Sequence, residues 1–337
     1  KAVEEARDRI SSAIKYTDKD FTPPKSTNKK IVISLAPATV KKEGSVFDVP
    51  MALSYLLAIG DIKGKPDNTL FAGELSLDGT LRPIRGALSI AQVARKKGYA
   101  ALVLSQENAE EAALVDGIDV YGARTLAQII AHIQPKKSVP LSKVAAPERK
   151  DMPRGSVSFD DIRGQGHAKR ALQIVAAGAH NVALWGPPGT GKTMLARALL
   201  SILPPLSPEA VIEVTTIHSY AGAKDDTDDA VMRYPPFRSP HHTTSYAALI
   251  GGGTIPKPGE VTLAHRGVLF LDEFAEFRKD CVNALREPME DGVVSVSRAR
   301  GTSTFPANFI LVAALNPCPC GRAGSARCEC SAITVER

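Results

Sequence analysis

Apolar and polar positions along residues 1–134 recur in patterns that predict both helices and strands. Two short apolar runs, residues 31–35 and 100–104, are typical of buried strands. Residues 51–59 and 126–133 carry apolar side chains at helical spacing and predict buried helices, the second of which closes the region. The pattern therefore predicts an α/β domain over residues 1–134.

Proline, lysine and serine are frequent in residues 135–158, where the periodicity stops. Prolines at positions 135, 140, 147 and 153 keep such a segment semi-extended, so we expect a linker. The chain is thereby predicted to hold two domains, residues 1–134 and 159–337, which agrees with its length of 337 residues.

Residues 159–337 show short apolar runs that alternate with helical patterns. A helix is predicted at 168–177, and strands at 181–185, 210–215, 267–271 and 308–314. This alternation indicates an α/β fold with a mostly parallel sheet flanked by helices.

The loop after the strand at 181–185 has the sequence of a phosphate-binding loop, and a helical pattern follows it. The loop consists of Gly186, Pro187, Pro188, Gly189, Thr190, Gly191, Lys192 and Thr193. Its glycines let backbone N–H groups wrap phosphates, Lys192 would reach the β and γ oxygens, and the Thr193 hydroxyl would bind Mg²⁺. Strand, loop and helix occur in the required order, which disfavours a chance glycine-rich turn and predicts binding of ATP with Mg²⁺.

Two carboxylates, Asp272 and Glu273, end the apolar strand at 267–271. A solvated strand end is the simpler interpretation, but desolvating paired charges is costly, which favours a use for them. Asp272 would hold Mg²⁺, and Glu273 would orient and deprotonate the attacking water. Asn316, which follows the last apolar strand, can help to position that water. We therefore expect an ATP hydrolase whose catalytic residues are Lys192, Glu273 and Asn316.

Further segments carry a resemblance to a known family. Residues 159–165, with Ile162 and Gly164, resemble the adenine-side segment with which AAA+ ATPase modules begin. Residues 237–242 (Phe-Arg-Ser-Pro-His-His), 251–253 (Gly-Gly-Gly) and 258–260 (Pro-Gly-Glu) resemble the magnesium-chelatase-like branch of these ATPases. Within that branch the chain resembles the ComM (also called YifB) family over nearly its whole length. The resemblance implies a homo-hexameric DNA helicase that drives branch migration during recombination of transforming DNA in competence.

Two hairpins are expected in the second domain. The resemblance implies an insert at about 219–254, followed by a hairpin tip at 255–259 that contains proline and glycine. Strand patterns at 293–297 and 304–306 predict the second hairpin, with its tip at 298–301.

Three basic residues at these tips, Lys257, Arg298 and Arg300, are candidates for DNA contacts. In a ring of six chains both tips would face the central channel, where they would meet the phosphates of single-stranded or branched DNA. A solvated surface charge is an equal alternative for each of them. His241 and His242 are as well suited to pack, or to cap a helix starting at residue 243, as to touch DNA.

Four cysteines form two close pairs near the end of the sequence: Cys318 and Cys320, then Cys328 and Cys330. Tetrahedral Zn²⁺ prefers four soft ligands, which two Cys-x-Cys pairs joined by a short loop can supply. The spacing is tighter than in a zinc ribbon, and reduced free thiols are the alternative. The ComM family carries a comparable cluster, and we predict structural zinc. Cys281, alone on an apolar helix face, is predicted to lie in the core.

The first domain resembles the proteolytic domain of Lon in residues 73–79 and 82–84. That chemistry needs a serine activated by a lysine. The nucleophile position falls on Val46, next to Ser45, and the lysine position falls on Leu88. Because apolar side chains cannot transfer a proton, we expect a domain that is inactive as a protease and has a structural or DNA-engaging role.

Composition changes this picture little. The 42 basic and 36 acidic residues give a net charge of +6, a mild bias that does not by itself indicate nucleic-acid binding. Four of the five cysteines lie between positions 318 and 330, unlike a secreted disulfide framework, so we expect a cytoplasmic protein. No run of about 18 apolar residues occurs, and no membrane partner is expected.

The chain begins at Lys1 inside an amphipathic pattern and stops at Arg337, so we expect a longer natural protein. The resemblance implies a C-terminal lid and an arginine that reaches the γ-phosphate bound by a neighbouring chain. Arg322 and Arg327 lie inside the cysteine loop and are poor candidates, so both features are expected beyond residue 337.

Two other functions are compatible with these residues. A protein-remodelling or metal-insertion ATPase of the chelatase type would use the same hairpins to grip protein. An ATP-dependent protease would use the first domain, but Val46 and Leu88 disfavour it. Stimulation of ATP hydrolysis by DNA separates the DNA motor from the first alternative, and digestion of casein tests the second.

Overall fold

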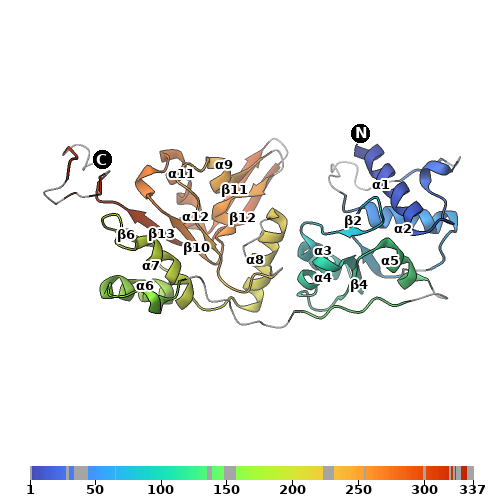
Figure 1. The fold of residues 1–337 in the computed structure, drawn as a ribbon, viewed down its shortest axis with the longest axis horizontal. Helices are drawn as coiled ribbons and strands as arrows, with labels where there is room; N and C mark the ends of the chain where they lie inside the picture. The colour runs from blue at the N-terminus through green and yellow to red at the C-terminus, as the bar shows by residue number, and fades with distance from the viewer. Residues whose placement is uncertain are drawn as a thin grey trace. The chain divides into compact units, whose positions relative to one another are not determined.

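The structure of the chain, a computed structural model, describes residues 2–27, 30–33, 45–64, 66–134, 139–147, 157–222, 231–253, 256–298, 301–318, 320, 321, 323 and 328–331. The chain splits into two units, residues 1–149 with 222–231, and residues 150–221 with 232–337 (Figure 1). No helix among the described residues is long and apolar enough to cross a membrane.

A three-stranded parallel sheet organises the first unit, in the order β1 (Thr69–Phe71), β4 (Ala101–Ser105) and β5 (Asp119–Ala123). A short antiparallel hairpin is formed by β2 (Glu74–Leu75) and β3 (Leu81–Arg82). The helices are α1 (Ala2–Thr17), α2 (Asp48–Ile59), α3 (Ala87–Lys96), α4 (Gln106–Ala112) and α5 (Leu126–Ile133), with a 3-10 turn, η1 (Pro24–Ser26).

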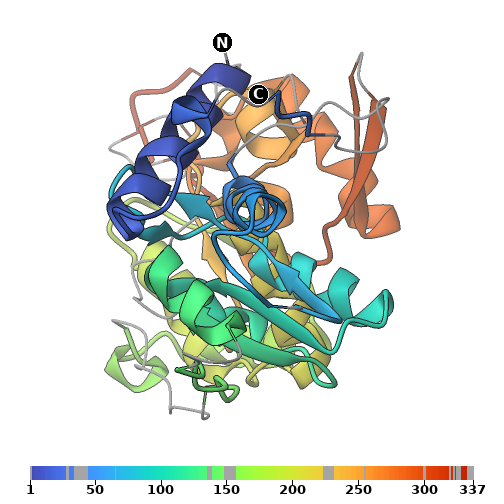
Figure 2. The ribbon, with the colours of Figure 1, turned by 90° about the vertical axis from the view of Figure 1, so that its right-hand side faces the viewer.

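The core of the first unit is built largely from α1, α2 and α5 (Figures 1 and 2). Ile14, Leu56 and Ile129, one from each helix, are fully buried together with Leu75 of β2 and Val103 of β4. Burial of each such side chain stabilises the fold by roughly 2 kcal/mol, which is why these amphipathic segments form helices here. The predicted helices at 51–59 and 126–133 and the predicted strand at 100–104 are confirmed.

The predicted strand at 31–35 is wrong where the structure describes it. Ile31, Val32 and Ile33 lie in no strand, and their side chains are 41%, 77% and 52% exposed. The rest of that run, Ser34 and Leu35, lies outside the described residues. A β-branched run forms a strand only where it can pack and pair in a sheet, so its composition alone was misleading.

Part of the predicted linker is attached to the first unit. Lys143 pairs with Tyr121 of β5 in an isolated antiparallel bridge. The backbone N–H of Leu141 donates to Nδ1 of His132 at 3.0 Å, and burial lowers the pKa of this histidine, which favours the neutral ring that can accept. Residues 139–147 are therefore not a free connection in this structure.

The second unit contains a four-stranded parallel sheet in the order β6 (Val182–Trp185), β13 (Ile310–Leu315), β10 (Val268–Leu271) and β7 (Phe237–Arg238). Its helices are α6 (Gly166–Gly178), α7 (Lys192–Ala198), α8 (Pro208–Ala221), α9 (Tyr246–Ile250), α10 (Glu260–Leu263), α11 (Lys279–Ala284) and α12 (Arg286–Asp291). The 3-10 turns are η2 (Phe159–Asp161), η3 (Leu199–Ile202) and η4 (Phe274–Glu276). The predicted α/β class with parallel sheets flanked by helices is confirmed.

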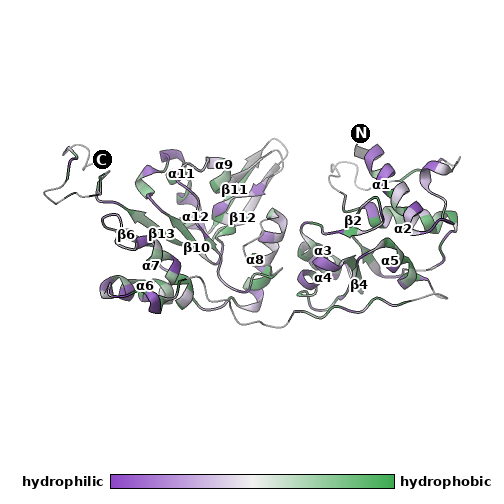
Figure 3. Cartoon of the chain, in the orientation of Figure 1, coloured by the Kyte–Doolittle hydropathy of each residue, from purple (hydrophilic) through white to green (hydrophobic). Residues whose placement is uncertain are grey.

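Both faces of this sheet are covered. Along β10, Val268 and Phe270 pack in a cluster with α6 and α7, whereas Leu269 and Leu271 pack in a cluster with α9, α10 and α11. All four side chains are at most 1% exposed, as expected for a parallel sheet between helical layers. The strands β10 and β13 accordingly stand out as apolar in Figure 3.

The predicted strand at 210–215 is wrong, because these residues lie inside α8. Ala210, Val214 and Ile217 are buried, and their spacing of three or four residues places them on one face of a helix. Pro208 fits the first helical position, where its missing N–H costs nothing. The β-branched residues suggested a strand, but the spacing of the buried positions favours the helix. The fourth strand of the sheet is instead β7.

Both predicted hairpins are present, but Lys257 and Pro258, which were predicted at the first tip, lie in a strand. One pairs β8 (Gly251–Gly252) with β9 (Lys257–Pro258), and the other pairs β11 (Val293–Arg298) with β12 (Gly301–Pro306). Arg298 lies opposite Gly301 at the second tip, whereas Arg300 lies outside the described residues. The helix expected from residue 243 begins instead at Tyr246, and the side chain of Ser245 caps it.

The buried carboxylate of Asp48, at the start of α2, is paired with the guanidinium of Arg9. Its side chain is 1% exposed, and the Arg9 guanidinium donates to its two oxygens at 3.0 and 3.2 Å. Burial raises the pKa of Asp48, while the hydrogen bonds from Arg9 and from the Leu75 N–H lower it. The position of α1 on α2 therefore rests on this pair as well as on apolar contacts.

Replacing the cation should destabilise the chain. We expect Arg9→Met to lower the free energy of unfolding by about 3 kcal/mol, because it leaves Asp48 buried without its partner. The matched control is Arg7→Met on the same helix, whose exposed guanidinium lies 3.9 Å from Asp8. Its effect should stay below about 1 kcal/mol. Urea unfolding followed by circular dichroism measures both variants, and equal effects would contradict this account of Asp48.

Candidate functional site

The phosphate-binding loop joins β6 to α7. Trp185 is the last residue of β6, and α7 begins at Lys192. Gly189 and Gly191 have φ of 78° and 86°, a left-handed backbone that glycine adopts without strain. The N–H of Gly186 donates to the Leu315 carbonyl at 3.2 Å, which attaches the start of the loop to β13. The predicted order of strand, loop and helix is present.

Lys192 and Asn316 are brought together, although 124 residues separate them in sequence. The Lys192 ammonium donates to Oδ1 of Asn316 at 3.0 Å and to the carbonyls of Gly186 and Pro187 at 2.7 and 3.0 Å. Asn316 directly follows β13, so the parallel pairing of β13 with β6 places it beside the loop. The ammonium thus lies inside the loop, where phosphate oxygens could replace its carbonyl acceptors.

The two predicted Mg²⁺ ligands also lie next to each other. The Thr193 hydroxyl donates to Oδ2 of Asp272 at 2.9 Å. Asp272 directly follows the buried strand β10, and its Oδ1 accepts the N–H of Glu273 at 3.0 Å. A hydroxyl and a carboxylate are the oxygen ligands that Mg²⁺ prefers, so this pair fits the ion that accompanies a nucleotide.

Glu273 has φ of 51°, a left-handed backbone that costs a non-glycine residue roughly 1–2 kcal/mol. Its carboxylate Oε2 lies 3.1 Å from Nδ1 of His242. The rings of His241 and His242 are 4.0 Å apart, and Nδ1 of His241 contacts the Thr243 hydroxyl at 2.9 Å. A strained residue whose side chain is held by a partner is typical of functional sites.

The contact of His242 with Glu273 was missed by the sequence interpretation, which left this histidine to helix capping or DNA. The signal was its position four residues after β7, whose parallel partner β10 ends beside the acid pair. Polar residues that follow neighbouring parallel strands meet at one edge of the sheet. The guanidinium of Arg238, in β7, forms a bidentate salt bridge with the Glu260 carboxylate, with N–O distances of 2.7 and 3.0 Å.

Part of the segment that was predicted to face the adenine contacts the phosphate-binding loop. Ile162 is buried in the core cluster that includes Leu195 of α7, and Gly164 has φ of 71°. Gln165 Nε2 donates to the Thr190 carbonyl at 3.4 Å, which connects this segment to the phosphate-binding loop. The role of Ile162 and Gly164 in holding an adenine stays a prediction.

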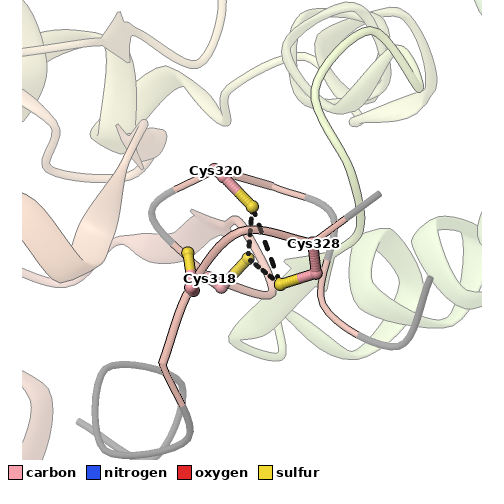
Figure 4. Close-up of side chains that lie close together, drawn as sticks. Cys318, Cys320 and Cys328 are labelled. Carbon is pink, nitrogen blue, oxygen red and sulfur yellow. Dashed lines mark hydrogen bonds between the residues drawn. The ribbon is translucent and has the colours of Figure 1, made fainter. Parts of the chain in front are cut away.

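Cys318, Cys320, Cys328 and Cys330 converge, with their sulfur atoms all within 4.8 Å of one another. The Sγ atoms of Cys318, Cys320 and Cys328 are separated by 3.3, 3.7 and 3.9 Å (Figure 4). These distances exceed the 2.05 Å of a disulfide by far. Four ligands at 2.3 Å from a tetrahedral Zn²⁺ would lie about 3.8 Å apart, so the donor set fits this ion in type and spacing.

The thiols of the cluster lie beside one another, whereas Cys281 lies alone in an apolar core. A backbone hydrogen bond from Cys320 lowers the pKa of the Cys330 thiol, but the Cys320 and Cys318 thiols and burial together raise it to about 11. The neighbouring thiols thus disfavour ionisation of Cys330 where no cation compensates. Cys281 is 1% exposed in the second unit's core, as predicted, and burial raises its pKa.

The remaining predicted residues lie away from these groups. Lys257 is exposed in β9, and Arg298 ends β11 at the tip of its hairpin. In the first unit, Leu88 is fully buried in α3, and the Ser45 hydroxyl donates to the Glu74 carboxylate. Leu88 therefore has an environment suited to its apolar side chain, and the inactivity of this unit as a protease stays a prediction.

Comparisons with known proteins agree on one family. Residues 158–337 match the family model described as "Magnesium chelatase, subunit ChlI", and residues 1–108 match the model described as "Subunit ChlI of Mg-chelatase". Thus one model covers the second unit's nucleotide site and the other covers most of the first unit.

Three relatives extend this finding to almost the whole chain. An uncharacterized protein of Mycobacterium tuberculosis is 42% identical over 100% of this chain and 65% of its own length. The uncharacterized protein YifB of Salmonella typhimurium is 43% identical, over 95% and 61%. The competence protein ComM of Haemophilus influenzae is 42% identical, over 95% and 62%. The chain thus spans less than two thirds of the length of these relatives, and it belongs to the magnesium chelatase subunit ChlI family, with the YifB and ComM proteins as close homologues.

Proposed function

We propose that this chain binds Mg-ATP and, within the full-length protein, hydrolyses it at the edge of the sheet where β6, β13 and β10 end. The observation that carries the proposal is the meeting of Lys192 with Asn316 and of Thr193 with Asp272. Lys192 would exchange the loop carbonyls for β- and γ-phosphate oxygens, and Thr193 with Asp272 would hold the Mg²⁺ that accompanies the nucleotide. Membership of the magnesium chelatase subunit ChlI family supports this assignment.

Glu273 would act as the base toward the attacking water. Its side chain is 49% exposed, so it can reach a water beside the phosphates, and His242 holds one of its carboxylate oxygens. Because a carboxylate needs both a free lone pair and a fixed direction to accept a proton efficiently, this contact supports a positioning role for His242. Asn316 would help to orient the same water.

Two substitutions should separate binding from turnover in the full-length protein. We expect Lys192→Ala to abolish nucleotide binding, because it removes the cation that faces the phosphates. Glu273→Gln should keep binding and lower turnover by roughly 10²–10⁴-fold, since the Thr193–Asp272 pair is intact. Titration with a fluorescent ATP analogue and phosphate-release assays measure the two effects.

Glu276→Gln is the matched control, because Glu276 is also exposed and lies in the turn that follows Glu273. It should leave binding and turnover unchanged. Hydrolysis by Glu273→Gln at the parent rate would show that another group is the base.

We propose further that hydrolysis drives a homo-hexameric DNA motor with branch-migration helicase activity on single-stranded or branched DNA, in recombination of transforming DNA. The 42% identity to a protein named for competence supports this step. The two hairpins support it as well, because the sequence places basic residues at or near their tips: Lys257 on one, Arg298 and Arg300 on the other. The predicted cytoplasmic location fits this role.

Neutralising the hairpins should weaken DNA binding in a salt-dependent manner. For Lys257→Gln, Arg298→Gln and Arg300→Gln we expect the slope of log K against log salt to fall by about 0.7 per lost contact on single strands. Lys279→Gln, on the exposed part of α11, is the matched control and should leave the slope unchanged. Fluorescence anisotropy over a salt titration measures the slope. Identical slopes for all variants would assign the three residues to the solvated surface.

A chelatase-type ATPase that acts on protein is the alternative. The 28% identity to a magnesium-chelatase 67 kDa subunit of Chlorobaculum tepidum, over 48% of this chain and 23% of that protein, favours it. Branched DNA should stimulate ATP hydrolysis by a DNA motor but not by such an enzyme, so this measurement distinguishes the two.

We propose that the four-cysteine cluster holds zinc. We expect one zinc per chain by elemental analysis of freshly purified protein, and Cys328→Ser should reduce the content well below one, because it removes one of four ligands. Cys281→Ala, which removes the cysteine outside the cluster, should retain the full content. Parent protein with far less than one equivalent would favour reduced thiols.

A further inference from the structure

The turn that carries Cys318 and Cys320 packs against the phosphate-binding loop. Gly321, which directly follows Cys320, is buried and has φ of 75°. A Cβ at this position would lie 2.3 Å from Cδ and 2.6 Å from Cγ of Pro188. Because a proline ring cannot move aside without moving the backbone that carries it, glycine is required here both for its conformation and for the space it leaves.

A second connection runs along the backbone. Asn316, whose amide oxygen accepts from Lys192, lies two residues before Cys318. The N–H of Gly321 donates to the Cys318 carbonyl at 2.8 Å. This hydrogen bond closes a tight turn that carries the first cysteine pair and lies against Pro188. The turn that carries Cys318 and Cys320 is thus joined at one end to the partner of Lys192 and at the other to the loop itself.

Metal binding would stiffen this turn. The sulfur–sulfur contacts of 3.3–3.9 Å within the cluster are weak hydrogen bonds at most. With a soft divalent cation, four metal–sulfur bonds would fix Cys318 and Cys320 to Cys328 and Cys330. The positions of Gly321 and Asn316 would then be fixed as well, and with them one wall of the phosphate-binding loop.

We propose that the metal-loaded cysteine cluster braces the phosphate-binding loop through Gly321 and Asn316, so that occupancy of the cluster by zinc sets the affinity for nucleotide. This inference rests on the proposed function, because it concerns the same nucleotide site. The cysteines touch no nucleotide in this scheme. Their role is to position Pro188 and the acceptor of Lys192.

The single tryptophan of the chain provides a direct probe. Trp185 ends β6, immediately before Gly186, and is 72% exposed. Energy transfer from Trp185 to mant-ADP therefore reports binding at this loop, and acrylamide quenching of Trp185 reports the state of the loop without nucleotide. ADP is used so that hydrolysis does not interfere.

Gly321→Ala is the decisive variant. It keeps all four cysteines and should retain one zinc per chain, but its Cβ must displace Pro188. We expect the Kd for mant-ADP to rise about tenfold or more, since small misplacements of positioning groups have large effects. The matched control is Gly292→Ala, which has the same kind of backbone, with φ of 67°, but no atom within 4 Å of the added Cβ. It should bind mant-ADP like the parent.

Removal of the metal is the second arm. Chelation of zinc from the parent protein, and Cys328→Ser, should raise the Kd for mant-ADP to a similar extent. Cys328→His can supply a nitrogen ligand and should restore both zinc and affinity. Unchanged secondary structure by circular dichroism would separate this effect from unfolding.

Two results would overturn the proposal: unaltered mant-ADP affinity in Gly321→Ala or after chelation, or a parent protein that holds no zinc. Failure of the proposed function has a different signature. If the parent binds zinc but no nucleotide, acrylamide quenching of Trp185 still tests the brace, which predicts a change of quenching on chelation and in Gly321→Ala but not in Gly292→Ala. Acrylamide quenching that is the same in the parent, after chelation and in both variants would then overturn the proposed brace.

Discussion

The parallel pairing of β13 with β6 on one side and β10 on the other is the constraint on which the candidate site depends. Strands that run the same way end at the same edge of the sheet, so the groups that follow them meet there. Lys192 and Asn316 become neighbours through the first pairing, and Thr193 and Asp272 meet at the same edge. Both faces of the sheet are buried, which fixes these strand ends more firmly than surface loops could be fixed.

Two further contacts hold residues of the candidate site in place. His242 reaches Glu273 from the segment after β7, and Gly321 reaches Pro188 from the cysteine turn after β13. Each contact links a residue of the candidate site to a segment that follows another strand of the sheet. The proposed zinc and His242 would therefore act on the proposed nucleotide site through Pro188 and Glu273.

The sequence predicted the polar groups that follow the strands and missed a contact that depends on the order of the strands in the sheet. The phosphate-binding loop, the acid pair and the cysteine pairs are short patterns whose chemistry is evident from neighbouring residues, and the structure brings their members together. The contact between His242 and Glu273 depends on the order of strands in the sheet, which no local pattern contains. The errors at 31–35 and 210–215 have one cause: β-branched residues favour strands only where a sheet receives them, and in α8 the helical spacing of buried positions overrides that preference.

The central claim is that the site at the ends of β6, β13 and β10 hydrolyses ATP to act on DNA. The most direct test is the rate of phosphate release by the full-length protein with Mg-ATP, with and without branched DNA. The account predicts measurable hydrolysis that branched DNA accelerates. Hydrolysis that DNA leaves unchanged would contradict the DNA motor, and the absence of hydrolysis under both conditions would contradict the assignment of the site itself.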